Sequence, residues 1–172
     1  MLRVNTTSSG PRSAATRHAL LPLRLFLGIT FVYAGVDKLL DPAFLSATGD
    51  GSIGQQLEGV KGSAAIPALV AVALNDPGGF GLAMALGETA VGVGVLAGLL
   101  TRIAALGGAL ISLSLWLTVS WQATPYYYGN DLAYLMAWTP LVLAGAPTLS
   151  LDAALRRRRA TPRGRRRVNR RG

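Results

Sequence analysis

The chain has 172 residues, of which 51% are hydrophobic and only 15% are charged, a balance on the apolar side of a typical soluble domain. It contains no cysteine, which excludes disulfides, thiolate metal sites and cysteine-bound iron–sulfur clusters within this chain. Its single histidine, His18, precedes the first apolar run, so we expect neither a haem nor a metal. Any electron carrier is then a non-covalently bound organic molecule or belongs to a partner.

Basic residues are concentrated at the C-terminal end. Ten arginines lie within residues 156–172 without any acid, so the formal net charge of +9 leaves −1 for the rest of the chain. Arginines next to a membrane helix each gain about 1 kcal/mol from anionic lipid. We therefore expect residues 156–172 to form a cytoplasmic Arg-rich tail that binds anionic lipid, and we expect no nucleic-acid partner.

The first apolar run covers residues 19–40 and follows a polar lead, residues 1–18, that lacks hydrophobic periodicity. The lead is typical of a disordered N-terminus. A cleaved signal peptide is one interpretation of the run, because basic residues precede it and Ala34-Gly35 supplies small residues. Its length and its charged end, Asp37-Lys38, favour a transmembrane helix instead.

An acidic segment, residues 41–79, separates the first apolar run from the second. Within it, Ile53, Leu57 and Val60 recur at helical spacing, and residues 64–74 are apolar but too few to span a bilayer. This pattern is typical of an interfacial or re-entrant helical segment.

Three further apolar runs follow, at residues 80–100, 103–121 and 131–146. The first two have the roughly 20 residues that a span needs. The last reaches that length only if it extends over about residues 128–149, with a kink at Pro140. The sequence therefore predicts an all-α fold over residues 19–155: an integral membrane four-helix bundle with an outer interfacial or re-entrant segment between helices one and two.

Charged residues in the connections predict the orientation of this bundle. The arginines of the lead, Arg102 and the arginines of the tail would share one side, whereas residues 41–79 and 122–130 are acidic or neutral. Because basic loops stay in the cytoplasm, we expect a multi-pass protein of the bacterial inner (cytoplasmic) membrane with both termini cytoplasmic.

Small residues predict close packing between the first two long helices. The two faces consist of Arg24, Gly28, Phe31, Gly35 and Lys38 on the first helix and Gly87, Ala90, Gly94 and Gly98 on the second. Gly94-x-x-x-Gly98 is a small-xxx-small pattern, which lets two helix backbones approach closely.

Glu88 is the acid expected deepest in the membrane, since it lies about nine residues, or roughly 13 Å, into the second long helix. A carboxylate at that depth is costly unless it faces the bundle interior and is neutral or paired. We expect a cation such as Arg24 or Arg102 to be its partner.

A second polar cluster is expected where Asp37 and Lys38 end the first helix and Asn130 and Asp131 begin the fourth. The candidate ligand-binding residues are therefore Glu88, Arg24, Asp37, Lys38, Arg102, Asn130 and Asp131. They would line a polar cavity that binds a small ligand or moves a proton. The alternative is structural: buried ion pairs, interfacial charges and, for Asp131, a helix cap.

Several segments of the chain resemble the DoxX family. They are Arg24-Leu25-Phe26-Leu27-Gly28, Tyr33-Ala34-Gly35-Val36-Asp37-Lys38-Leu39, Asp41-Pro42-Ala43-Phe44-Leu45, Gly87-Glu88, Leu99-Leu100-Thr101-Arg102, Gly129-Asn130-Asp131 and Leu149-Ser150-Leu151-Asp152. Together these segments cover about residues 20–155. The resemblance implies a DoxX-like four-helix membrane bundle.

The resemblance also implies a role as the small subunit of a thiosulfate:quinone oxidoreductase, or a similar accessory role in a quinone-linked redox or oxidative-stress complex. A quinone would then be the bound organic molecule, and a soluble or membrane redox protein or a second copy of the chain would be the partner. The alternative is a non-catalytic membrane scaffold or small-molecule carrier that recruits partners and anionic lipid.

Overall fold

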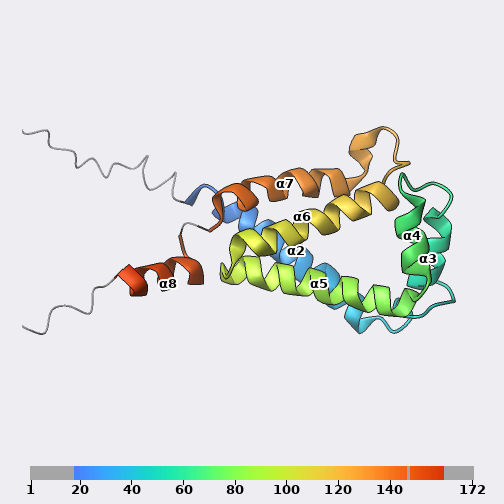
Figure 1. The fold of residues 1–172 in the computed structure, drawn as a ribbon, viewed down its shortest axis with the longest axis horizontal. Helices are drawn as coiled ribbons and strands as arrows, with labels where there is room; N and C mark the ends of the chain where they lie inside the picture. Colours follow the sequence, from blue (N-terminus) through green and yellow to red (C-terminus); the bar gives the residue numbers. More distant parts are fainter. Residues whose placement is uncertain (1–17, 147, 161–172) are drawn as a thin grey trace, which may run out of the picture.

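The structure, a computed structural model, describes residues 18–146 and 148–160. The predicted disordered lead lies outside these ranges except for His18, as does the tail from residue 161 onward. All regular structure within the described ranges is helical, which confirms the predicted all-α class. The elements are α2 (Leu21–Leu40), α3 (Ile53–Val60), α4 (Pro67–Leu74), α5 (Pro77–Ala97), α6 (Thr101–Thr118), the 3-10 helix η1 (Tyr126–Tyr128), α7 (Asn130–Ala144) and α8 (Leu151–Ala160) (Figure 1).

The long helices form two pairs. α2 lies along α5 and α6 lies along α7, and these are the most extensive contacts of the fold (Figure 1). Residues 98–100 join α5 to α6 at one end of the bundle, which we call the turn end; α3 and α4 lie at the other end. An apolar cluster unites the two pairs and consists of Leu27, Phe31, Val91, Val95, Ala105, Trp138 and Leu141.

Close packing of α2 against α5 is confirmed, and three glycines explain it. A Cβ atom at Gly28 would lie 2.5 Å from Leu96 Cγ, and one at Gly92 would lie 2.6 Å from the backbone nitrogen of Val32. At Gly35 a Cβ would lie 2.5 Å from the carbonyl oxygen of Ala85. Only glycine therefore permits this backbone separation at these positions.

The prediction of which glycines form the α5 side of this interface was wrong. Gly87 and Gly94 face α6, where their nearest neighbours are Ile111 and Ala104. Gly98 ends α5 with a left-handed φ of 66°, and its N–H bonds to carbonyls of the last turn, as glycine commonly does at helix ends. The Gly94-x-x-x-Gly98 pattern therefore records a helix terminus and a neighbour other than α2.

The helical segment predicted between the first two long helices is present as α3 and α4. Ser52 caps α3 by accepting a hydrogen bond from the backbone N–H of Gln55. Ala65, just before α4, is tied to the end of α6 by a 2.8 Å bond from its N–H to the carbonyl of Leu117. A second apolar cluster holds this end together; its members are Phe44, Ile53, Leu57, Val70 and Ala73. The interfacial or re-entrant character of the segment stays a prediction.

The fourth long helix is shorter than the sequence predicted. α7 has 15 residues, with Pro140 inside it, and does not extend over residues 128–149. Gly129 is extended, and Gly145 has a positive φ of 68°, so both flanking glycines leave the helical region. At the other end of the chain, α8 runs across the predicted domain boundary at residue 155, and that boundary stays a prediction.

Candidate functional site

Glu88 forms a buried ion pair with Lys38. The side chain of Glu88 faces the interior, as predicted, with 4% of the residue exposed. Its Oε2 lies 2.7 Å from Nζ of Lys38, whose side chain keeps 26% of its surface exposed. Lys38 also donates to the carbonyl of Ala34, at 3.3 Å. The predicted partners, Arg24 and Arg102, were wrong.

The register of α2 against α5 explains this pairing. Because Gly35 packs on Ala85 and Thr89 in an antiparallel pair, the next turn of α2 brings Lys38 beside the same stretch of α5. Arg24 lies 14 residues before Lys38, which corresponds to about 21 Å along the helix. Its guanidinium therefore cannot reach Glu88.

Asp131, on α7, and Ser120, in the loop that follows α6, form a second polar pair. The hydroxyl of Ser120 donates to Oδ2 of Asp131. Asp131 is half-buried in the first turn of α7, and its side chain does not cap that helix. Its charge acts on both Lys38 and Glu88. The two polar pairs therefore belong to one electrostatic site.

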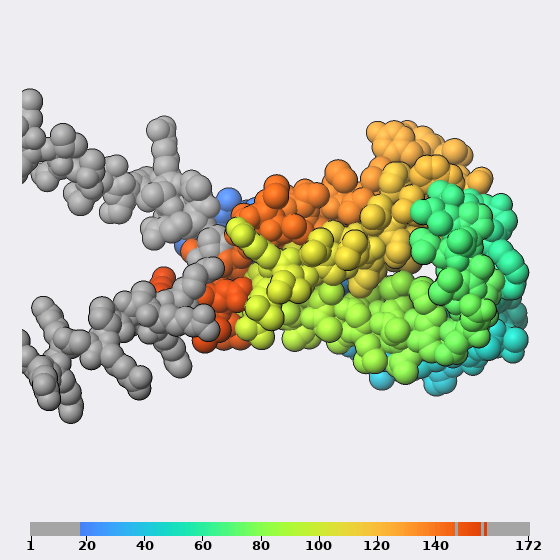
Figure 2. Space-filling view, viewed as in Figure 1, coloured from blue at the N-terminus to red at the C-terminus, as the bar shows by residue number. Residues whose placement is uncertain are grey.

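This site, Lys38, Glu88, Ser120 and Asp131, is called the polar layer below. It lies between the apolar cluster that unites the helix pairs and the cluster around α3 and α4. Figure 2 shows an opening in the surface at this end of the molecule, where α4, α5 and α6 meet. The polar layer contains an ammonium that can donate hydrogen bonds, a hydroxyl that donates to Asp131, and two carboxylates that can accept hydrogen bonds or carry protons.

Arg24 serves a different purpose at the turn end. It is 5% exposed, and its two terminal nitrogens donate to the carbonyls of Thr148 and Leu149, at 3.0 and 2.7 Å. The guanidinium thereby anchors the segment between α7 and α8. Arg102 acts in a similar way, since its Nη2 donates to the carbonyl of Leu143 at 2.8 Å.

Asp152 completes this anchor, although nothing in the sequence singles it out except its place in the DoxX-like ending. Oδ1 accepts the N–H of Leu100, at 2.9 Å, and Oδ2 accepts the N–H and the hydroxyl of Thr101, at 3.0 and 3.1 Å. α6 has no side-chain cap of its own from Leu100. The carboxylate of Asp152 supplies that cap from 51 residues further along the chain.

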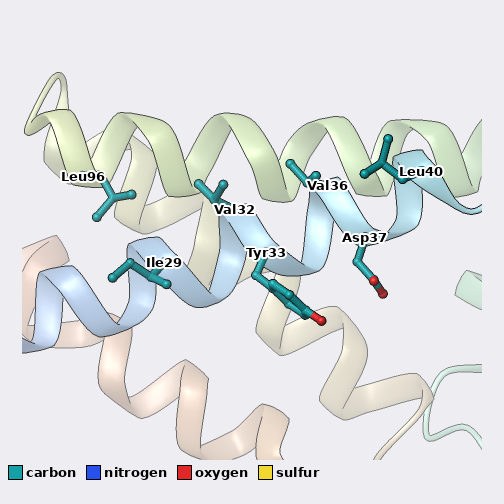
Figure 3. Close-up of a pocket in the computed structure, with 7 residues that line it drawn as sticks. All are labelled: Ile29, Val32, Tyr33, Val36, Asp37, Leu40 and Leu96. Atoms are coloured by element: carbon teal, nitrogen blue, oxygen red, sulfur yellow. The ribbon is translucent and has the colours of Figure 1, made fainter.

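Two predicted site residues lie outside the polar layer. Asn130 is exposed at the first position of α7. Asp37 is exposed on the outer side of α2, where it lines a groove with Tyr33 and apolar residues (Figure 3). The predicted cluster is therefore divided: Lys38 and Asp131 join Glu88, and Asp37 does not. Ser120 was missed because an isolated serine near the end of a helix carries no sequence signal.

The surface of the long helices indicates a class of protein. α5 and α6 are long and apolar enough to cross a membrane, and only 28% of the most apolar stretch of each is buried within the protein. Apolar helices that direct most of their surface outward are typical of contact with lipid rather than of a soluble core. These features are those of a helical membrane protein.

The chain belongs to the DoxD family. Residues 19–165 match the family model described as "TQO small subunit DoxD", where TQO denotes thiosulfate:quinone oxidoreductase. This is a DoxX-like membrane family, so the resemblance noted from the sequence is confirmed. Searches of curated proteins and of solved structures found no match.

Proposed function

We propose that the chain is the membrane-embedded subunit of a thiosulfate:quinone oxidoreductase-type complex and that the polar layer receives the head group of a quinone. α2, α5, α6 and α7 would all cross the bacterial inner membrane, with both termini cytoplasmic. Membership of the DoxD family supports the complex. The observation that carries the site is the buried Lys38–Glu88 pair, because an ion pair inside a membrane protein is costly and is usually retained for function.

The residues of the polar layer suit a quinone head group. Quinone carbonyls accept hydrogen bonds, and the side chain of Lys38 is partly exposed. Its ammonium has three N–H groups, of which two bond to Glu88 and to the carbonyl of Ala34, so the third can donate to a quinone. Reduction of a quinone to a quinol consumes two electrons and two protons. Glu88 and Asp131 are the groups placed to hold and deliver protons, and the electrons would come from a sulfur-oxidising partner subunit.

The site differs from a pocket built on Glu88 and Arg24. Arg24 donates its terminal N–H groups to backbone carbonyls at the turn end, so it would position the C-terminal segment rather than bind quinone. Lys38 takes its place as the cation of the site.

Retention of quinone by the purified protein tests this proposal. Protein extracted in a mild detergent should carry menaquinone or ubiquinone, and Glu88→Gln should lower the retained amount by about fivefold or more. Glu58→Gln is the matched control, since Glu58 is an exposed acid on α3 that pairs with the exposed Lys61. Equal quinone content in the wild type and in Glu88→Gln would count against the site.

A scaffold role is the second candidate, and the anchored position of α8 favours it. Arg24 and Asp152 fix the beginning of α8 to the bundle, so the arginine-rich segment starts from a defined place near the turn end. Anionic lipid or a redox partner would bind there. Removal of residues 156–172 should then abolish co-purification of that partner without changing the retained quinone.

A further inference from the structure

We propose that the groove on the outer side of α2 binds a phospholipid whose head group ends in a primary ammonium, with that ammonium on Asp37 and one acyl chain along the groove. This inference goes beyond the quinone-linked role, because the groove lies on the outer face of α2, whereas the polar layer faces the bundle interior. The occupant is identified by the shape of the groove and by its charge.

The groove has the length and the lining of an acyl-chain site. Its volume is about 420 Å³, and Figure 3 shows its side chains along one side of α2 beside α5. The apolar lining consists of Ile29, Val32, Val36, Leu40 and Leu96. From Ile29 to Leu40 the helix advances about 16 Å, which is close to half of the ~30 Å hydrocarbon core. One acyl chain of one leaflet therefore matches it.

Asp37 supplies the charge that selects the head group. Its carboxylate is exposed and, throughout the part of the chain that the structure describes, makes no hydrogen bond or ion pair. A carboxylate next to lipid is costly unless a cation accompanies it. Asp37 lies one turn before the end of α2, and the end of a helix that crosses a bilayer meets the lipid head groups, so a head group can provide that cation.

The negative charge of Asp37 and the position of Tyr33 distinguish among lipid head groups. An anionic head group would be repelled by Asp37. A quaternary ammonium carries no N–H, whereas a primary ammonium donates charge-assisted hydrogen bonds to a carboxylate. Tyr33 lies one turn away and is 69% exposed; its hydroxyl can donate to the phosphate that precedes the ammonium. Asp37 and Tyr33 together therefore match the ammonium and the phosphate of phosphatidylethanolamine.

Competitive lipid binding tests the proposal. Full-length protein in detergent is mixed with equal amounts of phosphatidylethanolamine, phosphatidylcholine and phosphatidylglycerol. The lipids that stay bound are identified and quantified by native mass spectrometry. The wild type should prefer phosphatidylethanolamine over phosphatidylcholine, and Asp37→Asn should lower that preference roughly fivefold. Glu58→Gln, which removes an exposed acid elsewhere, should leave it unchanged.

A second variant separates the chain site from the charge. Val36→Phe adds bulk inside the groove while Asp37 is kept, and it should reduce the amount of phosphatidylethanolamine retained. The proposal is overturned if the wild type shows no head-group preference, if Asp37→Asn keeps the wild-type preference, or if Val36→Phe retains as much of this lipid as the wild type.

Discussion

Nζ of Lys38 lies 2.7 Å from Oε2 of Glu88, across 50 residues of sequence and from one helix to the next. The pair is a polar connection between α2 and α5, with one residue from each helix. It lies at the level where the apolar cluster of the bundle ends. A buried charge that loses its partner destabilises a fold more than the pair stabilises it.

Glu88→Gln should therefore lower the free energy of unfolding by about 2 kcal/mol, less than for a fully buried pair because Lys38 is partly exposed. Lys38→Met should have a similar effect, and the double variant should lose less than the two single losses added together. Denaturant titration of the protein in mixed micelles measures all three. Strict additivity would mean that the two residues do not interact.

Close approach at Gly35 predicts a second effect on stability. A methyl group there would lie 2.5 Å from the carbonyl oxygen of Ala85, so Gly35→Ala should push α2 away from α5 and cost about 1–3 kcal/mol. Gly87→Ala is the matched control, because its nearest neighbour is 3.7 Å away. The same titration should show little change for the control, and equal losses in both variants would contradict the packing.

The hydrogen bonds of Asp152 should stabilise the C-terminal segment against the start of α6. Asp152→Asn would replace one of the two accepting oxygens by an NH2 donor, so the bond to the N–H of either Leu100 or Thr101 would be lost, at a cost of about 1 kcal/mol. Hydrogen exchange should accelerate at the start of α6 and in α8, with the rest of the bundle unchanged. Asp50→Asn, in an exposed loop, should leave both regions protected; unchanged exchange in Asp152→Asn would refute the cap.

The absence of cysteine from the sequence allows topology to be measured with single introduced thiols. Gly59→Cys places a thiol on the exposed side of α3, where a Cβ meets nothing within 4 Å. Arg157→Cys places one on α8. A membrane-impermeant thiol reagent added to intact cells should label the first and not the second. Labelling at Arg157→Cys would reverse the proposed orientation.

The sequence predicted the elements of the fold better than their register. Apolar runs placed α2, α5 and α6, and the 3.6-residue period placed Gly28 and Gly35 on the face that packs against α5. The ends of α7 were misjudged because Gly129 and Gly145 interrupt an otherwise apolar segment, and backbone conformation at glycine is decided by the surrounding structure.

The candidate site was predictable only in part for a related reason. Burial of Glu88 followed from its depth in an apolar helix, but the choice of Lys38 over Arg24 depends on how far α2 is displaced along α5. That displacement is set by Gly35 and Gly92, which permit contact at one register. Ser120 reaches Asp131 through the fold of the loop between α6 and α7, which has no periodic pattern.

Photolabelling with a quinone that carries a light-activated group tests the central claim most directly. The protein in lipid nanodiscs would be labelled, digested and mapped by mass spectrometry. We predict that the label attaches near Lys38, Glu88 or Ser120 and that excess unlabelled quinone suppresses it. Label confined to the turn end around Arg24 and Asp152, or label that unlabelled quinone does not displace, would contradict a quinone site in the polar layer.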